Sequence, residues 1–241
     1  MNDQIQSWLN RLRLPGMAKG WQTLVETRRA HELSLAEGLE ILLQSEEEQR
    51  NTKRFGRLVK NARFRYQASI EELLFDNSRG LDKSLITTLA SGSYIDTGDS
   101  ILVSGAAGCG KSFLLSSLGH QACAQGYSVA YFSTQKLLTR LKLARIDGTI
   151  TKLFDKLAKT KLLILDDFGF TKLEGQQLLD MMEIIEDRHA KTSTIIASQL
   201  PVANWYDVLA GQELIADAIL DRLVHSAFRI NLSGESLRKK R

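Results

Sequence analysis

The stretch Gly105–Ser112 constrains this chain more than any other, because it matches the phosphate-loop pattern G-x-x-x-x-G-K-[ST] directly after an apolar run. Glycine lets such a loop curl tightly and point its N–H groups at a polyphosphate, and the helix that follows adds its positive dipole end. A Gly-rich turn that contains Lys-Ser by chance is the alternative. The apolar strand before the loop and the helix after it favour a nucleoside triphosphate site, formed by Gly105, Ala106, Ala107, Gly108, Cys109, Gly110, Lys111, Ser112 and Phe113.

Two residues of this loop have specific expected roles. Lys111 would bridge the β- and γ-phosphates, and the Ser112 hydroxyl would bind Mg²⁺. Cys109 is either a reactive thiol or simply a small loop residue. The sequence thus predicts ATP and Mg²⁺ as cofactors.

Five short apolar segments alternate with helical stretches in the second half of the chain. They are predicted strands at residues 100–104, 128–132, 161–165, 193–197 and 228–232. Strands separated by helices form parallel sheets that are covered on both faces, with ligands at the carboxyl ends of the strands. We therefore expect an α/β domain over 99–241, after a helical domain over 1–70 and a connector over 71–98.

Two carboxylates follow the third predicted strand and complete the expected site. At this position Asp166 would hold Mg²⁺ opposite Ser112, and Asp167 would polarise an attacking water. A strand-ending turn would explain the pair equally well without the phosphate loop upstream. The fourth strand ends in Ser198 and Gln199, which could sense the γ-phosphate or merely begin a turn before Pro201.

The amino-terminal region is predicted to be helical. Ser34 and Glu37 have the spacing of a capping box, which starts a helix by satisfying two backbone N–H groups. Residues 44–54 are polar on all sides, so the helix either continues into solvent or breaks there.

A basic stretch covers residues 50–65. On a helical wheel, Phe55, Val59, Ala62 and Tyr66 form one stripe, and most bases cover the opposite side. Such a face suits a phosphate backbone, although a solvated face balanced by the upstream acids is the plain alternative. The bases are Arg50, Lys53, Arg54, Arg57, Lys60, Arg63 and Arg65.

The composition indicates the kind of partner and the cellular compartment to expect. The net charge of +4 is compatible with an acidic partner, and two cysteines argue against a disulfide framework. The sequence contains no run of 18 apolar residues and no signal-peptide core, so we expect a cytoplasmic protein without a membrane partner.

Several motifs in this order resemble the AAA+ ATPases, and more narrowly the IstB family of transposition helper proteins. They are the phosphate loop, Asp166-Asp167-Phe168-Gly169, Ser198-Gln199 and the segment 219–225 around Asp221-Arg222, together with residues 12–18, 46–65 and 234–240. The resemblance implies an AAA+ phosphate-loop domain with strand order 5-1-4-3-2. Only nine residues, 233–241, follow the last predicted strand, so in a departure from most AAA+ proteins we expect no full carboxy-terminal lid.

The same resemblance implies roles for single residues. Gln199 would be a polar sensor, Arg222 an arginine finger that reaches a neighbouring subunit's γ-phosphate, and Arg238 a second sensor. Most AAA+ proteins have Asp-Glu where this chain has Asp166-Asp167. The shorter Asp167 side chain would slow turnover, because water activation depends on geometry.

The resemblance also implies partners. It favours a homo-oligomer with ATP at its subunit interfaces, which binds duplex DNA through Arg50, Lys53, Arg54, Arg57, Lys60 and Arg63 and recruits a transposase for insertion-sequence transposition. A replicative helicase loader is the nearest alternative. A small-molecule kinase and an architectural DNA binder that uses ATP only for assembly are alternatives from other classes.

Overall fold

The computed structural model describes residues 2–209 and 212–237. The chain divides into two compact units, Met1–Arg57 and Leu58–Arg241. The boundary falls within one long helix, α3 (Leu35–Ala62). The division into functional domains at residues 70 and 98 stays a prediction.

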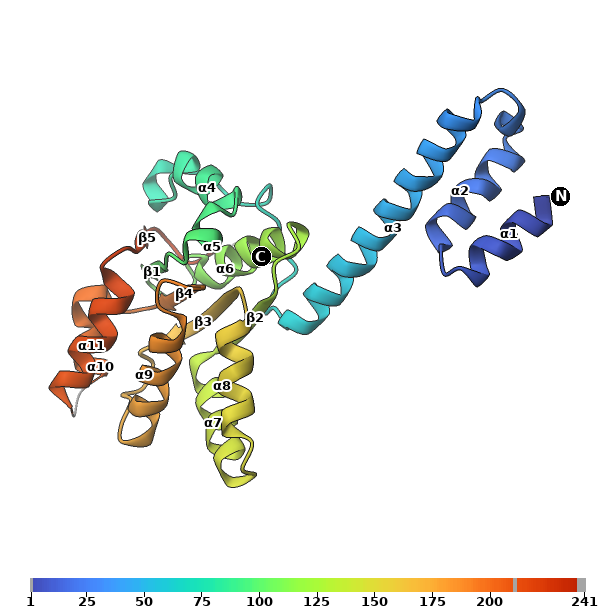
Figure 1. The fold of residues 1–241 in the computed structure, drawn as a ribbon. Helices are drawn as coiled ribbons and strands as arrows, with labels where there is room; N and C mark the ends of the chain where they lie inside the picture. The colour runs from blue at the N-terminus through green and yellow to red at the C-terminus, as the bar shows by residue number, and fades with distance from the viewer. Residues whose placement is uncertain (1, 210–211, 238–241) are drawn as a thin grey trace. The chain divides into compact units, whose positions relative to one another are not determined.

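The regular secondary structure described in the first unit is helical. It consists of α1 (Asn2–Arg11), α2 (Pro15–Glu26), the 3₁₀ turn η1 (Arg29–His31) and the first part of α3 (Figure 1). The predicted capping box is present, since the Glu37 carboxylate accepts the Ser34 backbone N–H at 2.8 Å and the Ser34 hydroxyl accepts the Glu37 N–H at 3.3 Å. Helix α3 passes through 44–54 without a break, and buried Glu46 accepts the backbone N–H of Gly16 at the start of α2.

The second unit is built on a five-stranded parallel sheet. The strand order β2-β3-β4-β1-β5 is the predicted 5-1-4-3-2 read from the other edge. All four neighbouring pairs are parallel. The strands are β1 (Ile101–Gly105), β2 (Val129–Ser133), β3 (Leu162–Phe168), β4 (Ser193–Ser198) and β5 (Phe228–Leu232), which confirms the five predicted strands.

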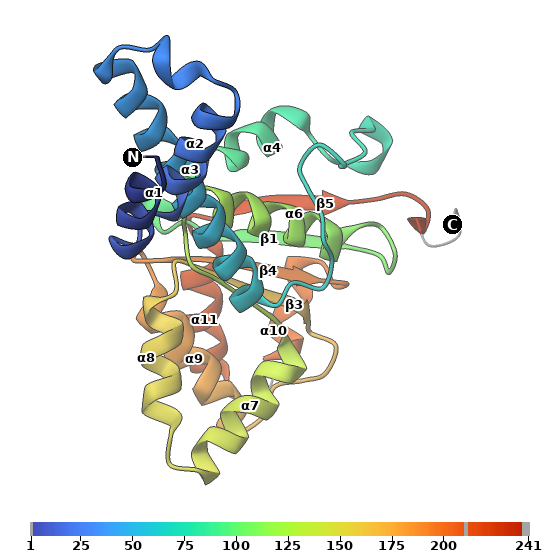
Figure 2. The same ribbon diagram turned by 90° about the vertical axis from the view of Figure 1, so that its right-hand side faces the viewer.

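Helices cover both faces of this sheet, as the views in Figures 1 and 2 agree. One face carries α4 (Lys83–Ala90), α5 (Ser93–Thr97) and α6 (Lys111–Ala124). The other carries α7 (Thr134–Ile146), α8 (Ile150–Lys159), α9 (Gln176–Arg188), α10 (Trp205–Val208) and α11 (Glu213–Val224). Two short 3₁₀ turns, η2 (Asn77–Arg79) and η3 (Val202–Asn204), complete the unit.

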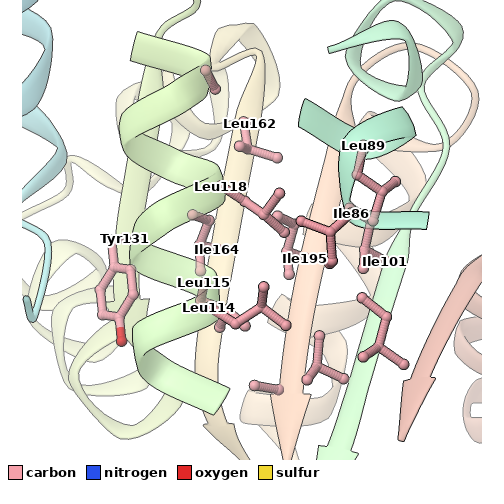
Figure 3. Close-up of a cluster of buried hydrophobic side chains, with 14 of the residues drawn as sticks. Ile86, Leu89, Ile101, Leu114, Leu115, Leu118, Tyr131, Leu162, Ile164 and Ile195 are labelled. Carbon is pink, nitrogen blue, oxygen red and sulfur yellow. The ribbon is translucent and has the colours of Figure 1, made fainter. Parts of the chain in front are cut away.

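Each face of the sheet has its own core. Ile101 of β1 belongs to the cluster under α6, whereas its neighbour Leu102 belongs to the cluster under α7 to α11. This alternation follows from the two-residue period of a strand, and burial on both faces explains why the strands are continuously apolar. Figure 3 shows Leu114, Leu115 and Leu118 of α6 directed onto the sheet beside Ile164 and Ile195. The phosphate loop therefore joins two buried elements, β1 and α6.

The end of α3 differs from the helical wheel drawn from the sequence. Arg63 has a left-handed backbone with φ of 59°, and the helix ends at Ala62. Arg65 and Tyr66 are consequently not on the basic helix or its apolar stripe. That part of the prediction was wrong because a single left-handed residue, which the wheel cannot represent, redirects the chain.

Arg188 at the end of α9 is a buried cation that connects several elements. Its side chain donates to the Thr194 hydroxyl at 3.0 Å and the Thr160 carbonyl at 2.7 Å, and also to the carbonyls of Leu157 and Ser193. Burial lowers the pKa of its guanidinium to about 9, which still leaves it protonated at neutral pH. In the part of the chain that the structure describes, we find no helix with the length and apolar character needed to cross a membrane.

Candidate nucleotide site

A cleft of about 840 Å³ opens beside the phosphate loop in the second unit. Residues 107–114 form one wall, and Asp167 and Gln199 reach it from the ends of β3 and β4. Apolar side chains form another part of the lining, namely Tyr66, Leu73, Leu74, Leu81, Phe170, Leu232 and Leu237. The cleft therefore combines polar groups suited to phosphates with an apolar region suited to a base.

The phosphate loop has the backbone geometry that its glycines permit. Gly105, Gly108 and Gly110 all have positive φ, and a Cβ on Gly105 would lie 2.3 Å from the Leu232 carbonyl oxygen. The buried Lys111 ammonium donates to the carbonyls of Gly105 and Ala106 at 2.6 and 2.9 Å. The lysine thus already lies against the loop that would hold the phosphates.

Asp166 and Asp167 lie side by side but in different environments. The register between β3 and β4 shifts between Leu165 and Phe168, so the two aspartates form an irregularity in the strand. Asp167 has a φ of 56°, a conformation that Asp tolerates better than most residues, and its side chain is 36% exposed. The Asp166 side chain is 0% exposed, and its Oδ1 accepts the Asp167 backbone N–H at 2.9 Å.

Tyr131 on β2 connects the two expected Mg²⁺ ligands. Its hydroxyl donates to Asp166 Oδ2 and is also hydrogen-bonded to the Ser112 side chain. Burial, reinforced by the negative charge of Asp166, raises the pKa of the Tyr131 hydroxyl, which keeps the proton on the tyrosine. In Figure 3 this hydroxyl is directed towards the carboxyl ends of the strands. Sequence reasoning missed Tyr131, although its place near the end of a predicted strand was a usable signal.

Arg65 is a second residue that sequence reasoning did not assign to this site. Its Nη1 donates to Asp167 Oδ2 at 3.1 Å and lies 3.4 Å from Asp166 Oδ2. Phe64 anchors the segment, because its ring lies 4.2 Å from that of His120 on α6. A Cβ on Gly119 would lie 2.3 Å from Phe64, so only glycine permits this close packing. Charge and periodicity placed Arg65 with the basic helix instead.

The predicted sensor and finger residues do not all line the cleft. Gln199 lines the cleft, whereas buried Ser198 donates to the Phe168 carbonyl at 2.7 Å and has a structural contact instead. Arg222 on α11 forms an ion pair with Glu186 of α9 and donates to the Ala218 carbonyl at 3.0 Å. It is absent from the lining of this cleft. Arg238 lies outside the described residues.

The residues after β5 lie against the phosphate loop. The Leu237 backbone N–H donates to the Gly108 carbonyl at 3.0 Å. Arg79 of η2 donates to the Glu235 carbonyl at 3.2 Å and the Cys109 carbonyl at 3.5 Å, which ties this segment to the loop. An isolated arginine in a turn gave no sequence signal for this position.

The donor set fits Mg²⁺ in its usual mode of binding. The described residues contain no group of three or more His, Cys, Asp or Glu side chains that could hold a metal ion together, so an all-protein cage is not present among them. Mg²⁺ is commonly bound by one or two protein oxygens together with waters and substrate phosphates. Ser112 and Asp166, joined through Tyr131, provide two such oxygens.

The six candidate DNA-binding bases, Arg50, Lys53, Arg54, Arg57, Lys60 and Arg63, are all exposed. Arg50 also pairs with Glu46 one turn earlier at 2.7 Å, so part of its charge is balanced. The exposure of these side chains is compatible with contact to an acidic partner.

The family described as IstB-like ATP binding protein matches residues 7–241. The chain belongs to this family. A Sinorhizobium fredii protein named as an insertion sequence ATP-binding protein is 44% identical over 231 residues, covering 96% of this chain and 94% of that protein. A similarly named protein of IS1162 from Pseudomonas fluorescens is 42% identical over 202 residues, covering 83% and 87%.

Solved structures confirm the fold predicted for this IstB-like chain. The crystal structure of DnaI has a TM-score of 0.57 at 18% identity, covering 75% of this chain and 92% of that one. The DnaC helicase loader has a TM-score of 0.53 at 21% identity, covering 66% and 95%. At these identities the likeness concerns the fold, an AAA+ phosphate-loop domain, and not the activity.

Proposed function

We propose that this IstB-like protein is an ATPase that assembles on duplex DNA with bound ATP and serves the transposase of an insertion sequence. The observation that carries the proposal is the family match over 7–241, combined with one cleft that collects the phosphate loop, Asp167 and Gln199. A replicative helicase loader remains the second candidate, because DnaC and DnaI have the same fold.

The phosphates of ATP would take the place that the loop carbonyls now hold beside Lys111. In this role the lysine leaves the Gly105 and Ala106 carbonyls and pairs with the β- and γ-phosphates. Mg²⁺, held by Ser112 and Asp166, would supply neutralising charge for these phosphates. The apolar part of the cleft that Leu73 and Leu81 line would receive the adenine.

Asp167 is the proposed residue that orients the attacking water. It lines the cleft and is the more exposed of the two carboxylates. Gln199 lines the same cleft and would contact the γ-phosphate or the water.

Arg222 is proposed to act on the ATP of a neighbouring subunit. Its own cleft lacks it, and its side chain is held at the α9–α11 contact by Glu186. A residue that acts in trans has to be displayed on a subunit surface, and 26% of the Arg222 side chain is exposed. Arg238 is proposed to act as a second sensor.

The exposed basic side chains of α3, and Arg63 directly after it, are proposed to bind DNA. Lys53, Arg57 and Lys60 extend over two turns of one helix, a spacing that can follow a phosphate backbone. Recruitment of a transposase is supported by the family and by relatives named for insertion sequences.

The decisive experiment measures ATP hydrolysis with and without duplex DNA, for the wild type and for Asp167→Asn. Asparagine keeps the size of the side chain and tolerates its left-handed backbone, so the variant removes charge with little strain. We expect DNA-stimulated hydrolysis that Asp167→Asn abolishes while ATP binding persists. DNA-independent turnover would favour a small-molecule kinase, and absence of turnover an architectural binder. Capture of a hexameric helicase in place of a transposase would favour the helicase loader.

A further inference from the structure

Arg65 has no role in the proposed function, yet it contacts both carboxylates of the site. Its Nη1 lies 3.1 Å from Asp167 and 3.4 Å from Asp166. Asp166 is fully buried beside the cleft, whereas Arg65 lines the cleft and contacts Asp166. The guanidinium therefore occupies the side of the carboxylate pair that faces the cleft.

The local backbone is arranged to bring Arg65 to this position. The left-handed Arg63 ends α3, the Phe64 ring packs on His120, and Tyr66 continues towards Phe113 at the start of α6, with a ring separation of 6.3 Å. Arg65 is thus held between two anchored aromatic residues. A surface arginine without a role would not need such fixation on both sides.

We infer that Arg65 is a nucleotide-responsive latch that occupies the carboxylates when Mg²⁺ and ATP are absent. A guanidinium and Mg²⁺ both bind carboxylate oxygens, and two positive charges repel each other at such short range. Arg65 and Mg²⁺ therefore compete for Asp166. Binding of Mg²⁺ and ATP releases Arg65, and with it the segment 63–67 that follows the basic helix α3. The inference rests on the proposed ATP site.

The arrangement gives a physical route from the nucleotide to the DNA-binding region. The latched state neutralises two carboxylates that otherwise have no cation among their described side-chain partners. Release exchanges one cation for another at the carboxylates and leaves the Arg65 charge free at the end of α3. That charge is then available to a phosphate of DNA.

The test compares Mg²⁺ dependence of nucleotide binding in the wild type, Arg65→Gln and Arg229→Gln. Arg229→Gln makes the same side-chain change at an exposed position on β5, away from the cleft lining. Binding of a fluorescent ATP derivative is measured during a Mg²⁺ titration without DNA. We expect Arg65→Gln to lower the Mg²⁺ concentration for half-maximal binding by about fivefold to tenfold, since a competitor is removed. The Arg229→Gln titration should match the wild type.

Hydrogen exchange of the 63–67 amides gives an independent readout. In the wild type, ATP with Mg²⁺ should raise exchange there, and ATP with a chelator should not. Arg65→Gln should exchange quickly in both conditions. Unchanged Mg²⁺ dependence, or weaker nucleotide binding at every Mg²⁺ concentration, would overturn the latch. A wild type that binds no ATP would instead refute the proposed function, so the two failures are distinguishable.

Discussion

Removing the hydroxyl of Tyr131 tests how the site holds its buried carboxylate. In Tyr131→Phe, Asp166 Oδ2 loses the phenol donor and the Ser112 side chain loses its partner. Hydrogen bonds to charged groups contribute about 1.5–3 kcal/mol. Asp166 keeps the Asp167 backbone N–H at 2.9 Å and a long contact to Arg65 at 3.4 Å. We therefore expect Tyr131→Phe to lower the free energy of unfolding by an amount in the lower part of this range, about 1.5–2 kcal/mol.

Two assays follow this change. A loss of that size corresponds to a fall in melting temperature of about 3–8 °C for a chain of this length. Because partners of a metal ligand fix its orientation, the Mg²⁺ concentration for half-maximal ATP binding should rise by about tenfold or more. This shift is opposite in sign to the one expected for Arg65→Gln, although both residues contact the same carboxylate.

Tyr127→Phe is the matched control. Its hydroxyl also donates to a carboxylate, that of Asp96 at 2.8 Å, but the pair is exposed and outside the cleft. The control should change stability by less than about 1 kcal/mol and leave Mg²⁺ dependence as it is. If Tyr131→Phe behaves like Tyr127→Phe in both assays, the reasoning about Tyr131 is wrong.

Three further predictions concern the core and the basic helix. Arg188→Met should lower the free energy of unfolding in urea by about 2–4 kcal/mol, because buried carbonyls at Thr160 and Ser193 lose their donor; a loss below about 1 kcal/mol would contradict this. Burial raises the pKa of the Cys123 thiol to about 12, whereas a thiol in the unfolded chain has a pKa near 8.5. The preference of the folded state for the protonated thiol therefore stabilises the protein fully below pH 8.5, and this stabilisation is lost as the pH rises towards 12. The free energy of unfolding should therefore fall by up to about 1.4 kcal/mol per pH unit between pH 9 and 10. Cys123→Ala should flatten this slope when unfolding in urea is measured at each pH, and equal slopes in the two proteins would contradict the prediction. Replacing Arg54 and Arg57 by alanine should weaken DNA binding for all sequences and reduce its salt dependence, and identical isotherms over a salt series would remove α3 from the interface.

The sequence predicted the parts of this molecule that depend on local patterns. Apolar runs such as Leu162–Leu165 located the strands, because a strand buried on both faces leaves no polar positions. The phosphate loop and Asp167 were placed in one cleft, since the ends of parallel strands meet at one edge of a sheet.

The contacts that the sequence did not predict are long-range or depend on one backbone angle. Arg65 and Asp166 are 101 residues apart, and their contact depends on the left-handed Arg63. Tyr131 lies on a different strand from Asp166, and only the pairing of β2 with β3 brings them together. Arg79 reaches Glu235 over 156 residues. No periodicity in a single sequence contains these pairings.

The most direct test of the whole account is the mass of the protein by light scattering, with ATP and duplex DNA each present or absent. We expect the wild type to form its largest assembly when both are present, and Lys111→Ala to stay small in all four conditions because its phosphate loop has lost the lysine. A wild type whose mass is the same in all four conditions, or a Lys111→Ala variant that assembles like the wild type, would contradict the claim that bound ATP joins copies of this chain on DNA.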